Sequence, residues 1–448
     1  MAADLRSAAD QAGPLADLSQ PPPTGWVRQA ASTGIDQARA VAVDGADNVF
    51  IAGYFTTSIN FGGGALSGAG GKDIYLAKYA SDGTLIWGKR FGGAGDDLPW
   101  GLATDSGGNV YVAGEIEGGV DLGGGALGNA GLSDMFVAKY SPSGAHLWSK
   151  RFGGLGYDQA RSVTVDASGN VLVTGTFMNS VGFGGGMLTS AGMYDVVLAK
   201  YSSDGSFIFA KRFGGTGNDM SEHLATDGAG NILLSGSFTG MASFGGATLV
   251  DQGNGDLFIA KYDQAGAHVF SKGFGGISND SGEGVVADSS GNIFLTGIFA
   301  NTVDFGGGPL NSPSSADIFL VKFNPSGAHL WSKRFGGNNT DAGISVAVDK
   351  SDNLILGGSF GGSVDFGGGA QNGGNFSSAY LAKYASDGTH MWSQGYSSTG
   401  FGFSAINCVA IDSKSFVFAA GYFSANMDLG SRTLTSTDTD TFLLKRLP

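Results

Sequence analysis

The sequence has very little cysteine and no concentration of basic charge. A single cysteine, Cys408, cannot form an intramolecular disulfide, so packing and strand pairing must hold the fold together. The 25 lysines and arginines are outnumbered by 39 acidic residues, which gives a net charge of -14. Proteins that bind nucleic acids concentrate basic side chains on one face, and no basic run occurs here. We therefore expect no nucleic-acid partner.

Long apolar runs are also missing. No stretch of 18 or more apolar residues occurs, so we expect no membrane-spanning helix. Residues 1–23 are polar, end in three consecutive prolines and lack the apolar core of a signal peptide. These residues are predicted to form a disordered tail.

Glycine, by contrast, is abundant, at 80 of 448 residues, and it recurs within copies of one pattern. Each copy pairs two apolar, β-branched hairpins such as ARAVAVD with NVFIAGYF, and DIYLAKY with TLIWGKRF, separated by glycine-rich turns. An aspartate marks the copies at intervals of 61 residues, with a last interval of 63. This series comprises Asp44, Asp105, Asp166, Asp227, Asp288, Asp349 and Asp412. Seven units of four strands predict an all-β fold, a seven-bladed β-propeller of antiparallel blades over residues 24–448.

The phase of the repeat predicts how the ring closes. In the first six units an aromatic strand, such as the one that contains Trp87, follows the repeated lysine. In the seventh unit no such strand follows Lys445. The missing strand is at the other end, where Trp26 precedes Trp87 by 61 residues. Residues 24–30 are therefore predicted to form the outermost strand of the seventh blade, beside residues 440–446.

The repeated motif resembles a known family. VAVDxxGNVYVAGxF, followed by DFGGG, DxFxAKY, SDG and WxKRFGG, is similar to the bacterial SBBP β-propeller repeat, and the resemblance covers residues 24–448. It implies an exported or surface-associated bacterial protein, placed outside the cell or in the cell envelope. It brings no shared catalytic residues. Single positions depart from the pattern, such as Ser378 where other units have aspartate.

Repeated charged residues are interpreted as structural. Three aspartate series, which begin at Asp36, Asp44 and Asp73, supply 19 of the 39 acidic residues, and every blade needs the same turns. Repeated calcium sites are a less favoured alternative, because calcium needs about six to eight oxygens and no EF-hand loop is present. We expect no metal and no cofactor. The lysine series that begins at Lys78 is predicted to form ion pairs with one aspartate series.

One position differs between blades more than almost any other. It lies three residues after the Asp36 series, near the start of the strand that a propeller places innermost, so its seven residues should ring one mouth of the central channel. The candidate ligand-binding residues are Arg39, Trp100, Arg161, Glu222, Glu283, Ile344 and Asn407, with Glu115 and Glu117 as further irregular positions in the second unit. The alternative interpretation is relaxed surface drift. Arginine and tryptophan facing glutamate and asparagine would form a polarised pocket.

Three functions are compatible with this pattern. The first is a non-enzymatic binding or adhesion scaffold for a protein or glycan, because no catalytic constellation is visible. The second is a multivalent lectin with one sugar site per blade. The third is a glycosidase or polysaccharide lyase with acids at the channel mouth. We favour the first, and we expect a monomer that is not an enzyme.

Overall fold

The computed structural model describes residues 24–32, 34–313, 315–399, 402–430 and 432–448, and every regular element in these ranges is a β-strand. Consequently no helix in the described part of the chain is long and apolar enough to cross a membrane. Residues 1–23, for which a tail was predicted, lie outside these ranges.

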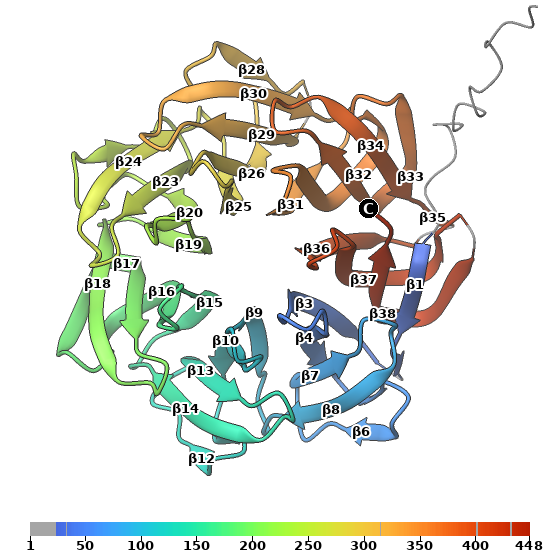
Figure 1. Cartoon of the computed structure of the whole chain (residues 1–448). Helices are drawn as coiled ribbons and strands as arrows, with labels where there is room; N and C mark the ends of the chain where they lie inside the picture. Colours follow the sequence, from blue (N-terminus) through green and yellow to red (C-terminus); the bar gives the residue numbers. More distant parts are fainter. Residues whose placement is uncertain (1–23, 33, 314, 400–401, 431) are drawn as a thin grey trace, which may run out of the picture.

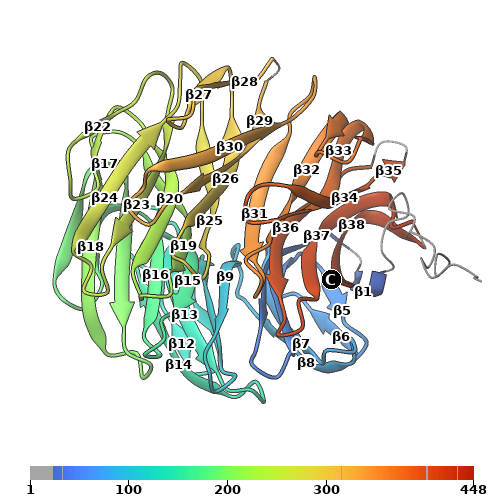
Figure 2. The ribbon, with the colours of Figure 1, turned by 45° about the horizontal axis from the view of Figure 1, so that its top comes forward.

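Seven antiparallel sheets, each with four main strands, form a ring in the described part of the chain, which confirms the predicted propeller (Figure 1). Two of the sheets also include short strands from the connections. From the innermost strand outward, the first three blades are β3 (Asp36–Val43), β4 (Val49–Phe55), β7 (Asp73–Tyr79) and β8 (Leu85–Phe91); β9 (Leu98–Thr104), β10 (Val110–Ile116), β13 (Asp134–Tyr140) and β14 (His146–Phe152); and β15 (Gln159–Val165), β16 (Val171–Gly182), β17 (Met187–Tyr201) and β18 (Phe207–Gly215). The tilted view of Figure 2 shows each blade as a twisted sheet.

The other four blades repeat this order. They are β19 (Asp219–Thr226), β20 (Ile232–Phe238), β23 (Asp256–Tyr262) and β24 (His268–Phe274); β25 (Ser281–Ala287), β26 (Ile293–Phe299), β29 (Asp317–Phe323) and β30 (His329–Phe335); β31 (Ala342–Val348), β32 (Leu354–Asp365), β33 (Ala370–Tyr384) and β34 (His390–Tyr396); and β36 (Ser404–Ile411), β37 (Val417–Asp428), β38 (Thr433–Arg446) and β1 (Thr24–Gln29).

Short strands lie in the connections between and within blades. They are β2 (Ala31–Ser32), β5 (Ser58–Asn60), β6 (Ala65–Ser67), β11 (Val120–Asp121), β12 (Ala126–Leu127), β21 (Met241–Ser243), β22 (Leu249–Val250), β27 (Thr302–Asp304), β28 (Pro309–Asn311) and β35 (Ser398–Thr399).

The core lies between neighbouring blades. The two middle strands of the first blade, β4 and β7, are buried along their whole length because another sheet covers each face. One apolar cluster, for example, joins Phe50 and Leu76 of the first blade to Val112 and Phe136 of the second. Each blade therefore depends on its neighbours for burial, which explains why the middle strands read as continuous apolar runs.

The two ends of the chain close the ring as predicted. Strand β1 is the outermost strand of the seventh blade and pairs with β38, with Thr24 opposite Arg446 and Gln29 opposite Phe442. In Figure 1 the blue β1 lies beside the red β38. The strand ends at Gln29, one residue short of the predicted boundary.

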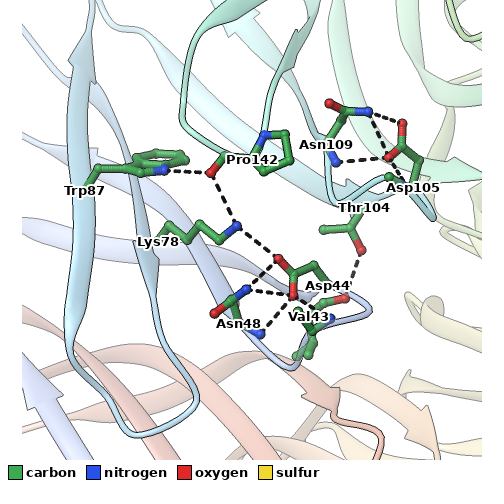
Figure 3. A network of polar contacts seen from close by, with 11 residues as sticks. Val43, Asp44, Asn48, Lys78, Trp87, Thr104, Asp105, Asn109 and Pro142 are labelled. Carbon is green, nitrogen blue, oxygen red and sulfur yellow. Dashed lines mark hydrogen bonds and ion pairs between the residues drawn. The ribbon is translucent and has the colours of Figure 1, made fainter.

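A repeated polar latch joins neighbouring blades, and its ion pairs confirm the predicted ones (Figure 3). Its bond to the next blade is made by Lys78, Lys139, Lys200, Lys261, Lys322 and Lys445. In the first blade Lys78 Nζ lies 3.0 Å from Asp44 Oδ2, and it also donates a hydrogen bond to the carbonyl of Pro142 in the second blade. Trp87 Nε1 donates to the same carbonyl at 3.1 Å. The other lysine–aspartate pairs are Lys139–Asp105, Lys200–Asp166, Lys261–Asp227, Lys322–Asp288, Lys383–Asp349 and Lys445–Asp412.

The aspartate of this latch also shapes a turn, as the sequence suggested. Asp44 Oδ1 accepts hydrogen bonds from the backbone N–H groups of Ala46 and Asn48. Although burial alone would raise the pKa of Asp44, hydrogen bonds from Asn48 and Lys78 lower it below its ordinary value. The carboxylate is therefore the stable form at neutral pH, and it compensates the buried ammonium group of Lys78.

The other two aspartate series meet at the blade junctions rather than in simple turns. Asp97, at the start of the second blade, accepts backbone hydrogen bonds from Gly93 and Glu117 and belongs to a junction that contains Asp73 of the first blade. Arg90 lies 3.6 Å from Asp73. Burial, with a contribution from the nearby Asp73 charge, raises the pKa of Asp97 to about 7. Asp158, Asp219, Asp280 and Asp341 share this upward shift, to about 6 or 7.

One junction is built without charge. Between the sixth and seventh blades the two aspartates are replaced by Ser378 and Ser404, and the arginine by Gly395. The Ser404 hydroxyl accepts a hydrogen bond from the backbone of Ala379 at 3.0 Å. The two aspartates do not depend on the arginine, since the junction between the fourth and fifth blades keeps Asp256 and Asp280 with Gly273 at the arginine position.

Candidate functional site: the bulge ring in the central channel

The innermost strand of every blade contains a β-bulge at the position where the seven copies differ. In the first blade Ala38 pairs with Gly53 and Ala40 pairs with Ala52, so Arg39 is the extra residue. The same irregularity places Trp100, Arg161, Glu222, Glu283, Ile344 and Asn407 between paired neighbours. A bulge changes the direction of its side chain relative to the ladder. We call these seven residues the bulge ring.

The glycine opposite each bulge is required by the close approach of the two strands. A Cβ atom added to Gly53 would lie 2.0 Å from the carbonyl oxygen of Gln37, and one at Gly421 would lie 1.9 Å from that of Ala405. The equivalent glycines are Gly114, Gly175, Gly236, Gly297 and Gly358, each with a carbonyl oxygen at 2.0 Å. The glycine series of the sequence therefore accompanies the bulges, a reason that sequence reasoning missed.

All seven members of the bulge ring line one central cavity of about 600 Å³. The cavity lies among the innermost strands at the centre of Figure 1. Beyond the ring its wall continues with small and apolar side chains, such as Val163, Leu224 and Val346. The sequence correctly predicted that these residues gather around the channel, and the charged groups among them face one shared space.

Two arginines, one from each neighbouring blade, lie over the ring of the second blade's tryptophan. The Arg39 guanidinium carbon lies 4.6 Å from the Trp100 ring centroid, and the corresponding distance from Arg161 is 4.2 Å. Trp100 Nε1 donates a hydrogen bond to Glu115 at 3.0 Å, and Gln159 donates to the other oxygen of Glu115 at 2.8 Å. Glu115 therefore holds the Trp100 ring in place, although Glu115 itself does not line the cavity.

The acidic side of the ring is formed by Glu222 and Glu283. Arg161 donates two hydrogen bonds to Glu222 Oε2, at 2.6 and 3.1 Å. Burial of Arg161 works to lower its pKa, but the Glu222 charge outweighs this effect and raises the pKa above its ordinary value. For Glu283, burial and the charge of Glu222 raise the pKa to about 7. Glu283 is thus poised between its two protonation states near neutral pH.

The remaining candidates have simpler surroundings. Asn407 donates a hydrogen bond to the carbonyl of Ala38 at 2.8 Å, and Ile344 contributes an apolar segment to the cavity wall. Glu117 accepts a hydrogen bond from the Asp96 backbone in a connection outside the cavity. His223, which is not among the candidates chosen from the sequence, lines the cavity, and burial lowers its pKa to about 4. The sequence could have pointed to His223, because it directly follows Glu222 at the varying position.

The described residues offer no ready metal centre. Within the described ranges, no group of three or more histidine, cysteine, aspartate or glutamate side chains is placed to hold a metal ion. The bulge ring instead combines a guanidinium pair, an aromatic ring and two carboxyl groups. This arrangement can bind a polar ligand through charge and hydrogen bonds.

Comparison with known proteins agrees with the repeat and the fold. Residues 86–119 and 147–176 match the family described as "Beta-propeller repeat", SBBP. The chain carries SBBP β-propeller repeats. The two matched segments run from the outermost strand of one blade into the inner strands of the next, so an SBBP repeat, as matched, spans a blade junction.

The relatives of this chain are distant. It is 22% identical to an uncharacterized WD repeat-containing protein, L264, of Acanthamoeba polyphaga mimivirus, over 89% of this chain and 31% of the relative. It is 27% identical to the regulatory protein FlaEY of Caulobacter vibrioides, over 37% of this chain and 18% of the relative. The chain thus spans less than a third of the length of either relative.

Solved structures match over most of the chain, with TM-scores below 0.5. A chain of the mitotic checkpoint complex matches with a TM-score of 0.47 and 11% identity, covering 100% of this chain and 99% of that one. The structure of YCF48 bound to a D1 peptide matches with a TM-score of 0.42 and 10% identity, covering 96% and 100%.

Proposed function

We propose that this protein is a non-enzymatic binding scaffold, exported or at the bacterial surface, whose protein or glycan ligand occupies the central cavity at the bulge ring. The observation that carries the proposal is the convergence of the seven varying residues on one cavity. Relaxed drift would distribute charges without regard to one another, whereas Arg161 and Glu222 form a close ion pair across neighbouring blades. The volume of about 600 Å³ is typical of ligand sites.

Stoichiometry tests this proposal. Glycans and cell-envelope extracts are screened by thermal shift, and each hit is titrated by calorimetry. One site per chain, lost in an Arg39→Ala, Trp100→Ala variant, is expected. About seven equivalent sites that survive in the variant would instead support a lectin with one sugar site per blade.

One observation favours a second candidate, a glycosidase or polysaccharide lyase. Glu222 and Glu283 face one cavity in different surroundings, since Glu222 forms an ion pair with Arg161 and the pKa of Glu283 is raised to about 7 by burial and by the charge of Glu222. Such a pair can supply a base and an acid. If the chain cleaves a polysaccharide, a Glu222→Gln, Glu283→Gln variant should lose turnover. Unchanged turnover would exclude these acids.

A further inference from the structure

The two cations of the bulge ring differ in how they are compensated. Arg161 is paired with Glu222, and the charges of Glu283 and Glu115 also act on it. Arg39 has no carboxylate partner among the described residues, and its Nε is buried without a hydrogen-bond acceptor. The cavity therefore has one satisfied guanidinium and one that lacks an anion.

The surroundings of Arg39 stabilise its charge without using its donors. Its guanidinium carbon lies 5.5 Å from the Tyr54 ring centroid and 4.6 Å from that of Trp100. A cation–π contact satisfies charge, but it supplies no acceptor for an N–H group. Burying an N–H group without an acceptor is unfavourable, so a ligand that brings an acceptor to Arg39 would be favoured there.

We infer that the ligand of the central cavity is an acidic saccharide and that Arg39 binds its carboxylate group. This inference rests on the proposed function, because it assumes that the ligand occupies the cavity. A planar guanidinium presents a fork of donors that matches the two oxygens of a carboxylate. Blade one lies across the ring from blades four and five (Figure 1), so the acidic residues Glu222 and Glu283 face the other end of a ligand bound at Arg39.

The opposite side of the cavity fits hydroxyl groups. Glu222 accepts hydrogen bonds as a carboxylate, and Glu283 can accept or donate because burial and the Glu222 charge raise its pKa to about 7. The cavity of about 600 Å³ suits a few sugar rings. A folded protein partner would instead need a large surface outside the cavity, and stable protein interfaces bury roughly 1,200–2,000 Å². These features favour a saccharide over an acidic peptide.

The test titrates the whole chain by calorimetry with glucuronate, short oligogalacturonates, glucose and a short oligoglutamate peptide. The wild-type chain should bind the uronates at one site and bind them at least tenfold more tightly than glucose. Arg39→Ala should weaken uronate binding at least tenfold, and Arg39→Lys should restore part of it because the charge returns without the fork. Arg432→Ala, which removes an exposed arginine outside the cavity, serves as the matched control and should leave binding unchanged.

Each other outcome overturns the inference. Equal binding of glucose and glucuronate, or uronate binding that Arg39→Ala leaves unchanged, would show that Arg39 does not recognise a carboxylate. Binding of the oligoglutamate alone would replace the saccharide by an acidic peptide. A neutral glycan that binds one site and is lost in Arg39→Ala, Trp100→Ala would end this inference but leave the proposed function standing. If no envelope component binds the cavity either, both fail. Thermal melting confirms that each variant is folded.

Discussion

The lysine–aspartate latches and the bulge ring each occupy one fixed place in the repeat, but the latch residues are identical in all seven copies and the bulge residues vary. The latch is the same pair in every blade, from Lys78–Asp44 to Lys445–Asp412. The bulge ring holds arginine, tryptophan, glutamate, isoleucine and asparagine on one backbone geometry. A latch residue must satisfy a buried partner, whereas a bulge residue has its backbone fixed by the glycine opposite and its side chain directed into the channel. Architecture and chemistry are thus assigned to different positions.

Breaking one latch should give the largest effect on stability. Lys139→Met leaves Asp105 buried without its cation and removes the hydrogen bond to the Ser203 carbonyl of the next blade. Removing one partner of a buried pair costs roughly 3–5 kcal/mol. The free energy of unfolding in urea measures the loss, with the exposed Lys350→Met as the control. A loss under about 1 kcal/mol, no larger than an ordinary surface substitution causes, would show that the latch is not structural.

A side chain added opposite one bulge should lower the free energy of unfolding by less, and it should also disturb the bulge ring. Gly114→Ala places a Cβ atom 2.0 Å from the Leu98 carbonyl, so β9 and β10 must separate near Trp100. Overpacking of this kind costs about 1–3 kcal/mol. Gly128→Ala in the same blade, where nothing lies within 4 Å of the added atom, is the control. Urea unfolding and tryptophan fluorescence are compared, and equal stability of the two variants would contradict the bulge explanation.

The smallest expected effect concerns the charged junctions. They should determine how the free energy of unfolding changes with pH. Burial, the nearby Asp195 charge and the local hydrogen bonds together set the pKa of Asp219 at about 7, so the folded chain holds a proton that the unfolded chain releases above about pH 4. The free energy of unfolding should therefore fall as pH rises from about 4 through 7.

The uncharged junction supplies the matched variant for this prediction. Asp195→Ser, Arg212→Gly, Asp219→Ser copies Ser378, Gly395 and Ser404 into the junction between the third and fourth blades. The expected result is a shallower decline of the urea midpoint between pH 5 and 8. An unchanged slope would assign the pH dependence to other groups.

The sequence was sufficient for the ring because its period is nearly constant. A 61-residue interval locates every strand, and the displacement of Trp26 relative to Trp87 predicts β1 at the rim of the seventh blade. The Lys78 series was also predictable, since a lysine in a buried strand requires a carboxylate. Both inferences use residues that repeat.

The bulges and their side-chain contacts could not be predicted in the same way. A bulge arises from the pairing register between two strands. In the sequence itself Arg39 follows the ordinary alternation of its strand, so nothing marks it as the extra residue. The glycine series was visible, yet nothing in one sequence says which carbonyl approaches Gly53. The role of Glu115 behind Trp100 depends on side-chain conformations in two strands, so sequence reasoning placed it among ligand-binding candidates.

Closure by β1 has a consequence for the order of events during synthesis. The strand Thr24–Gln29 is made before every other strand of the propeller, but its partner β38 is completed only at Arg446. At about 5–20 residues per second, a ribosome leaves the early strand without its partner for roughly 20–80 s. Trp26 and Lys445 then donate to the same carbonyl, that of Ser81, so the first blade receives its last contacts from both ends of the chain at once. A nascent chain can therefore assemble the ring blade by blade, but it can close the ring only after β38 has been made.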